Sequence, residues 1–141
     1  MHSSPMTIRD LMVSRCEAGS NGGGLFMSTA TGLSINNAQF DSCVSSGQGG
    51  GLYVVEQVDM VLSMLNITGC GAVYRGGGIY GAGNTQSELS NVSISHCSCS
   101  VLNGGGIALD AGNANVTLLN TSISHCSAIS GGGMDINGEN S

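Results

Sequence analysis

The sequence predicts an all-β fold: a right-handed, single-stranded parallel β-helix (solenoid) of about five coils, with about 27 residues and three short strands in each coil. Three observations lead to this prediction. Glycine triplets recur at an almost constant spacing, cysteines recur at nearly the same spacing, and apolar residues alternate with polar ones between them. A chain of 141 residues is long enough for one domain with its own core. We therefore expect a single β-helix domain over residues 1–141, with coils from about residue 6 to residue 136.

The glycine triplets divide the chain into repeats. Their spacing is almost constant along the chain, and a period of this length is typical of solenoids. At such a corner, a positive φ or a close approach of two coils leaves no room for a Cβ atom. A phosphate-binding loop is the alternative, but the chain has no Lys and no matching motif. The triplets are Gly22–Gly24, Gly49–Gly51, Gly76–Gly78, Gly104–Gly106 and Gly131–Gly133.

Alignment of the repeats shows which positions face the interior. Seven columns across five repeats give 35 positions, of which 32 are apolar, whereas the whole chain is 40% apolar. The polar residues between these columns give a period of two, which predicts strands. Parallel crossovers are overwhelmingly right-handed, which sets the expected hand. One such column holds Val13, Phe40, Ile67, Ile94 and Ile123.

The cysteines form another interior column, which is most simply a stack of small buried hydrophobic residues. Coils about 4.8 Å apart also satisfy the Cα separation of a disulfide, so pairing between coils stays open. Cys99 falls outside the period and has either a local partner or a free thiol. The column consists of Cys16, Cys43, Cys70, Cys97 and Cys126.

The charge and the hydropathy exclude two classes of partner. Three Arg, no Lys and a net charge of −6 disfavour binding to nucleic acid. No apolar run reaches the roughly 18 residues of a membrane span.

The first residues lack the apolar region of a signal peptide, and neither end carries a capping segment. We expect the chain to be a fragment of a longer repeat protein, or to lack caps of its own and to stack end to end with further coils or subunits.

Several coils resemble the repeats of a known family. "NVSISHCSCSVLNGGGIAL", "NTSISHCSAISGGGMDI" and "LSINNAQFDSCVSSGQGGGLYV" are similar to the repeats of the polymorphic outer membrane proteins of chlamydial type, which form right-handed parallel β-helices. The present chain has GGG before Leu, Ile or Met in place of GGA, and Leu33-x-x-Asn36 in place of Phe-x-x-Asn. The resemblance implies a cell-surface or extracellular location and an adhesive or structural role.

Three aromatic residues follow the glycine triplets at one position of successive coils. Phe26, Tyr53 and Tyr80 should point outward and form a strip about 10 Å long. Such a strip suits a protein or a glycan bound to a lateral face. Simple stacking between coils on the exterior is the alternative.

Four N-x-[ST] sequons mark possible glycosylation at Asn66, Asn91, Asn115 and Asn120. We expect only Asn115, in a longer loop, to be freely accessible. Asn37, Asn91 and Asn120 share a corner column, where stacked amides can bond to one another or to the backbone.

Two histidines and the scattered carboxylates are the remaining candidates for chemistry. His96 and His125 share a column and could hold Zn²⁺, but sequence duplication alone explains their placement. No two carboxylates share a column in adjacent coils, whereas enzymes of this fold that act on polysaccharides need clustered acids. We therefore expect a non-enzymatic scaffold without a cofactor. The alternative is a carbohydrate-active, pectate-lyase-like enzyme or a carbohydrate-binding module.

Overall fold

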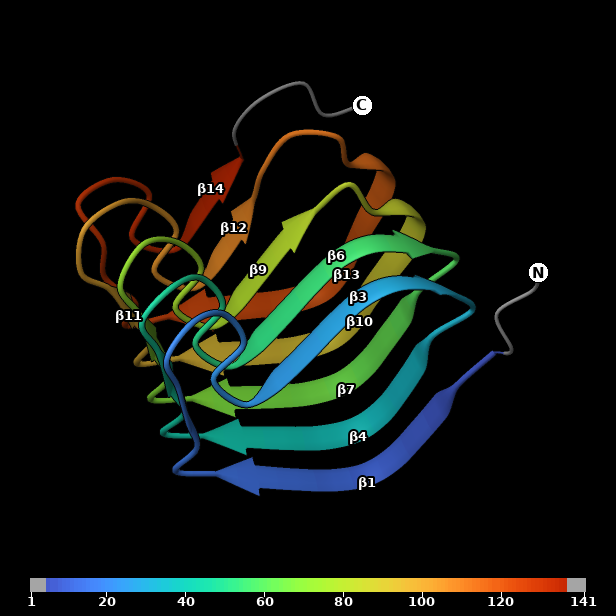
Figure 1. Ribbon diagram of the computed structural model, residues 1–141, viewed down its shortest axis with the longest axis horizontal. Helices are drawn as coiled ribbons and strands as arrows, with labels where there is room; N and C mark the ends of the chain where they lie inside the picture. Colours follow the sequence, from blue (N-terminus) through green and yellow to red (C-terminus); the bar gives the residue numbers. More distant parts are fainter. Residues whose placement is uncertain (1–4, 137–141) are drawn as a thin grey trace.

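Residues 5–136, which the computed structural model describes, form a β-solenoid of about five coils (Figure 1). Within these residues all the regular structure is β-strand and none of it is helix. Every strand pairing is parallel and joins equivalent positions of successive repeats. The predicted all-β, parallel β-helical fold is confirmed.

The longest strands of the coils lie side by side and pair in chain order (Figure 1). Their register places equivalent repeat positions opposite one another, so that Leu62 pairs with both Ile35 and Leu89. The step along the chain is constant up to the fourth coil and slightly longer to the fifth, where Leu89 pairs with Leu118. These strands are β1 (Thr7–Ser14), β4 (Ser34–Asp41), β7 (Val61–Thr68), β10 (Thr85–Ser95) and β13 (Ala114–Ser124).

Two further sets of strands close each coil, which confirms the three strands predicted per coil. The first set is short, and in the last coil it is reduced to a single bridge between Ser98 and Ser127. It consists of β2 (Glu17–Ala18), β5 (Val44–Ser45), β8 (Gly71–Ala72) and β11 (Ser98–Cys99). The second set consists of β3 (Leu25–Thr31), β6 (Leu52–Val58), β9 (Ile79–Ala82), β12 (Ile107–Leu109) and β14 (Met134–Ile136).

The chain turns its corners through residues with a left-handed backbone. Each of the long strands has such a residue at one equivalent position, with a φ between 48° and 60°, and β10 and β13 have a second one near their start, Gln86 and Asn115. Asn and Asp adopt this conformation more readily than most residues, and they fill four of the five positions. The five residues are Asp10, Asn37, Met64, Asn91 and Asn120.

The glycine triplets form a corner where successive coils approach very closely. Gly49 has a φ of +69°, which favours glycine. A Cβ atom added to Gly50 would lie 2.3 Å from the carbonyl oxygens of Gly71 and Gly77. These contacts confirm the structural role predicted for the triplets.

The core fills the three middle coils and is open at both ends. Ile35, Leu62 and Ile94, from columns predicted to face inward, are fully buried. The same columns are only partly buried in the first and last coils, where Met6 is 45% and Ile136 is 60% exposed. A coil buries its apolar face only against its neighbours, and each terminal coil has a single neighbour in this structure.

A buried ladder of side-chain amides supports the corner before the long strands. Asn84 Oδ1 accepts a hydrogen bond from the backbone N–H of Gln57, at 3.0 Å. Asn113 Oδ1 accepts one from the backbone N–H of Asn84, also at 3.0 Å. Asn84 Nδ2 also donates to the carbonyl oxygen of Val54 at 3.1 Å. The ladder thus satisfies backbone groups that would otherwise be buried without partners.

Candidate functional site

The aromatic column is in register, but its members differ widely in exposure. The ring centroids of Phe26 and Tyr53 are 4.8 Å apart, and those of Tyr53 and Tyr80 are 5.3 Å apart, with interplanar angles of 10° and 12°. Phe26 is 52% exposed, Tyr53 is half-buried and Tyr80 is only 6% exposed. The three rings are in register as predicted, but Tyr80 is covered, so the expected strip of three exposed rings does not form.

Stacking also limits what the aromatic column can bind. Tyr53 lies between Phe26 and Tyr80, so both faces of its ring are covered. A sugar ring stacks on an open aromatic face, and the stack leaves such a face only at Phe26, in the first coil. The column therefore joins coils more than it forms a lateral platform.

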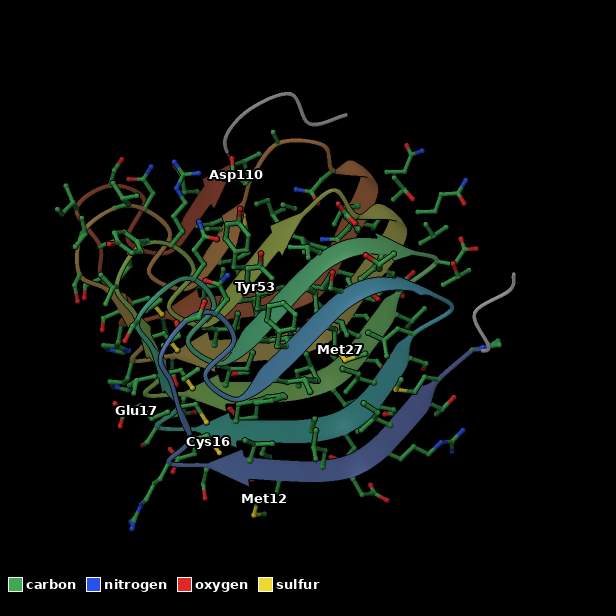
Figure 2. All side chains as sticks on the ribbon, in the orientation of Figure 1. Met12, Cys16, Glu17, Met27, Tyr53 and Asp110 are labelled. Atoms are coloured by element: carbon green, nitrogen blue, oxygen red, sulfur yellow. The ribbon has the colours of Figure 1, made fainter. Side chains whose placement is uncertain are left out.

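Tyr80 is covered by a polar clasp between the third and fourth coils. Its hydroxyl donates to Asp110 Oδ2 at 3.0 Å, and the Arg75 guanidinium forms an ion pair with the same oxygen. Asp110 Oδ1 accepts a hydrogen bond from the Ala111 amide N–H at 2.9 Å. Burial, and then the hydrogen bond to Asp110, raise the pKa of Tyr80. Both carboxylate oxygens are thus engaged, and the phenol stays protonated. Figure 2 labels Asp110 and also Tyr53, on which Tyr80 stacks.

One surface groove lies on the outer face of the long strands β1, β4 and β7. Its volume is about 370 Å³ and its rim is mostly amide and hydroxyl groups. Asp41 is the one carboxylate that lines it. Residues of this groove are Met12, Ser14, Gln39, Phe40, Asp41, Asn66 and Thr68.

A second groove of about 290 Å³ lies beside Tyr53 and Ala82. Glu56 is the carboxylate that lines it, and its Oε2 accepts a hydrogen bond from Thr29 Oγ1 at 2.9 Å. Neither groove is lined by two carboxylates, the arrangement that hydrolysis of a glycosidic bond requires. The acids are therefore not brought together in these grooves in the way an enzyme would need.

The two histidines lie one above the other at exposed corners. Their ring centroids are 4.9 Å apart and the rings are parallel within 3°. The nitrogen lone pairs lie in the ring planes, so those of His96 and His125 do not converge on one ion. Within residues 5–136, no cluster of three or more His, Cys, Asp or Glu side chains is arranged to hold a metal.

The cysteine column lies inside the solenoid, and its members are thiols. Cys43, Cys70 and Cys97 are buried, whereas Cys16 and Cys126 in the terminal coils are half-buried. Burial raises the pKa of Cys43 to about 11. A hydrogen bond with Cys97, and then burial, raise the pKa of Cys70.

The cysteine outside the repeat pattern is also a buried thiol. Cys99 belongs to β11, and its Sγ donates to the carbonyl oxygen of Tyr74 in the preceding coil. It pairs in register with Ala72, at an inward-facing position of the short strands. The interior placement thus accounts for this cysteine without a disulfide.

All four sequon asparagines are exposed, so the expectation that only Asn115 is accessible is wrong. Asn115 lies in β13 and not in a loop, because β13 continues the register of β10 as far as Ala114. Asn120 Nδ2 donates to Asn91 Oδ1 at 2.5 Å, as expected for a column of stacked amides. Asn66 lies on β7 and accepts a hydrogen bond from Thr68 Oγ1 at 3.3 Å.

The sequence analysis does not predict the amide ladder or the contact between Arg75 and Asp110. The members of the amide ladder do share a column, because Gln57, Asn84 and Asn113 are each one repeat apart in the chain. The contact between Arg75 and Asp110 spans 35 residues and follows no column, so the repeat alone does not reveal it.

No family model, curated protein or solved structure matches this chain. The part of the chain that the structure describes contains no helix that is long and apolar enough to cross a membrane. The geometry of the solenoid and of its surface is therefore the basis on which a function can be inferred.

Proposed function

We propose that this chain is a non-enzymatic structural or adhesive β-helix scaffold of a cell-surface or extracellular protein, or a scaffold subunit of a larger assembly. The observation that carries the proposal is the in-register stacking of about five coils through strands, side-chain ladders and close glycine contacts. An element of this kind holds its outer residues at fixed spacings and resists bending.

The surface chemistry supports a role in binding or spacing more than a role in catalysis. Asp110 is held by Arg75 and Tyr80, and the imidazoles of His96 and His125 stack on each other. The grooves place single carboxylates beside amides, hydroxyls and backbone. General acid and base catalysis of glycoside cleavage needs two such carboxylates facing one site.

For the adhesive role, the favoured contact surface is the polar groove over β1, β4 and β7. Gln39 and Asn66 line it as exposed amides on neighbouring strands, paired in register. Amides and hydroxyls at a fixed spacing suit the hydroxyl groups of a glycan or the backbone of a protein. A carbohydrate-binding module is accordingly the second candidate function. We also propose that the coils belong to the repeats of the polymorphic outer membrane protein type, which is compatible with either role.

A binding and cleavage experiment tests this proposal. The purified chain should leave polygalacturonate intact, with and without Ca²⁺, and should bind glycans or surface proteins displayed on an array. The variant Gln39→Ala/Asn66→Ala should lose that binding, while Ser93→Ala, a change on the same face outside the groove, should retain it. Depolymerisation that Asp41→Asn abolishes would instead establish the carbohydrate-active enzyme.

A further inference from the structure

The two ends of the solenoid are complementary to each other. The first coil exposes one side of β1, β2 and β3, and the last coil exposes one side of β13 and β14. We propose that a second copy of this chain docks head to tail, so that the last coil of one copy lies against the first coil of the next. This inference rests on the proposed scaffold role, and it identifies the partner as the chain itself.

The apolar columns carry the first argument, because each continues across such a junction. The contact between coils within the chain is the established interface, and the same columns are half-buried at both ends. Docking would place Ile123 on Val13 of the next copy and Leu118 on Ile8. The partly buried apolar residues of the two ends are Ile8, Leu11, Val13, Cys16, Leu25 and Met27 in the first coil, and Val116, Leu118, Ile123, Cys126 and Met134 in the last.

The hydrogen-bond pattern also continues. Within the chain, the His96 amide N–H donates to the carbonyl oxygen of Ser124, one coil further on. The equivalent His125 N–H would donate to the Ser14 carbonyl of the next copy. In the opposite direction, the Val44 N–H donates to the Cys16 carbonyl. By the same pattern, the Glu17 N–H of the next copy would donate to the Cys126 carbonyl.

Charge does not oppose this arrangement at the carboxylate of the first coil. Asp10 Oδ1 accepts a hydrogen bond from Asn37 Nδ2 at 2.7 Å within the chain. In the docked pair, Asn120 of one copy would face Asp10 of the next, so a neutral amide and not a second carboxylate would lie opposite this charge. Two-fold docking of like ends would run the strands antiparallel, and the columns would then not coincide. A head-to-tail contact that continues the solenoid along its own axis does not close into a ring, so it yields linear assemblies.

The terminal thiols provide a direct report of the register. Docking would bring Cys126 of one copy beside Cys16 of the next, at the separation of adjacent coils, which permits a disulfide. The other thiols of the column are buried. Diamide would accept the two electrons and two protons that are released when the two Sγ atoms bond.

Four samples test this proposal: the unmodified chain, Cys16→Ser, Cys126→Ser and an equal mixture of the two variants, each treated with diamide at high protein concentration. We expect a ladder of reducible oligomers from the unmodified chain, monomer from either variant alone and dimer from the mixture. Peptide mass spectrometry should find Cys16 joined to Cys126. A dimer from one variant alone would show docking of like ends and would overturn the proposal.

A second pair of variants tests association without oxidation. Thr121→Lys places a charge in the end face, whereas Thr117→Lys places it on the outer surface of the same strand. Sedimentation velocity should show assemblies for the unmodified chain and for Thr117→Lys, and monomer for Thr121→Lys. An unmodified chain that stays monomeric and gives no cross-link would contradict the assembly. It would leave the binding test of the proposed scaffold role unaffected.

Discussion

The hydroxyl of Tyr80 donates a hydrogen bond of 3.0 Å to Asp110, the carboxylate of the next coil that also pairs with Arg75. This contact joins the end of the aromatic column to the turn that follows β12, and Arg75 links that turn to the corner just before the third glycine triplet. Arg75 also pairs as a β-bridge with both Gln48 and Asn103, so the clasp lies where three coils meet. It stabilises the position of Tyr80, which stacks on Tyr53.

Replacement of Asp110 by Ala should destabilise the fold more than replacement of Tyr80 by Phe. The first change leaves the partly buried Arg75 charge and the Tyr80 hydroxyl without their partner, which should cost about 3 kcal/mol. The second removes one hydrogen bond and keeps the ring, which should cost about 1 kcal/mol. Urea-induced unfolding measures both changes. Equal losses would show that the ion pair contributes nothing beyond the hydrogen bond.

The close approach at the glycine corner predicts a sharp contrast between two alanine substitutions. Gly50→Ala should lower the free energy of unfolding by about 3 kcal/mol, because its Cβ would meet rigid backbone oxygens at 2.3 Å. Gly71→Ala is the matched control, since its Cβ would find its nearest neighbour at 3.5 Å. Its effect should stay within about 1 kcal/mol. Thermal melts of the two variants that coincide would contradict the stacking at this corner.

The amide ladder predicts that loss of a buried asparagine lowers the stability of the fold more than loss of an exposed asparagine. Asn84→Ala would remove a buried amide and leave the Gln57 N–H without its acceptor, at a cost of about 2 to 3 kcal/mol. Asn91→Ala removes an amide from the exposed column and should cost less than about 1 kcal/mol. Chemical denaturation of both variants provides the measurement, and the reverse order would show that the ladder does not support the corner.

The thiol column predicts a loss of stability in alkaline solution. The pKa of the Cys43 thiol is raised from 9.0 to about 11 in the folded chain. Between these pH values, the unfolded chain has released a proton that the folded chain retains, so the free energy of unfolding falls as the pH rises. Cys43→Ala should show a smaller decline than the unmodified chain between about pH 9 and pH 11. Equal declines would mean that this thiol does not contribute.

The repeat makes the architecture predictable, because stacking imposes one environment on each column. Spacing alone predicts that Phe40, Ile67 and Ile94 lie in the interior, and all three are buried. The same reasoning predicts Tyr80 on the surface, where Asp110 and Arg75 in fact cover it. A column predicts which side of the strand a residue faces, but a loop of one coil that covers the neighbouring coil follows no period.

The candidate site is less predictable than the fold for a related reason. The sequence indicates which aromatic residues share a column, and the stack of Phe26, Tyr53 and Tyr80 confirms that register. It does not indicate that stacking covers both faces of Tyr53. Nor does it indicate the polar groove, which depends on how Gln39 and Asn66 stand on adjacent strands.

The coil register requires that Ile94 faces the interior. The most direct test of this register compares the stability of Ile94→Asp with that of Ser93→Asp. The two residues are neighbours on β10, but Ile94 is fully buried and Ser93 is exposed. An unpaired charge at position 94 should destabilise the fold by about 4 kcal/mol or more, whereas the same charge at position 93 should change it by less than about 0.5 kcal/mol. Urea denaturation followed by far-ultraviolet circular dichroism should show this difference. An unchanged midpoint in Ile94→Asp would contradict the register on which the scaffold and its assembly depend.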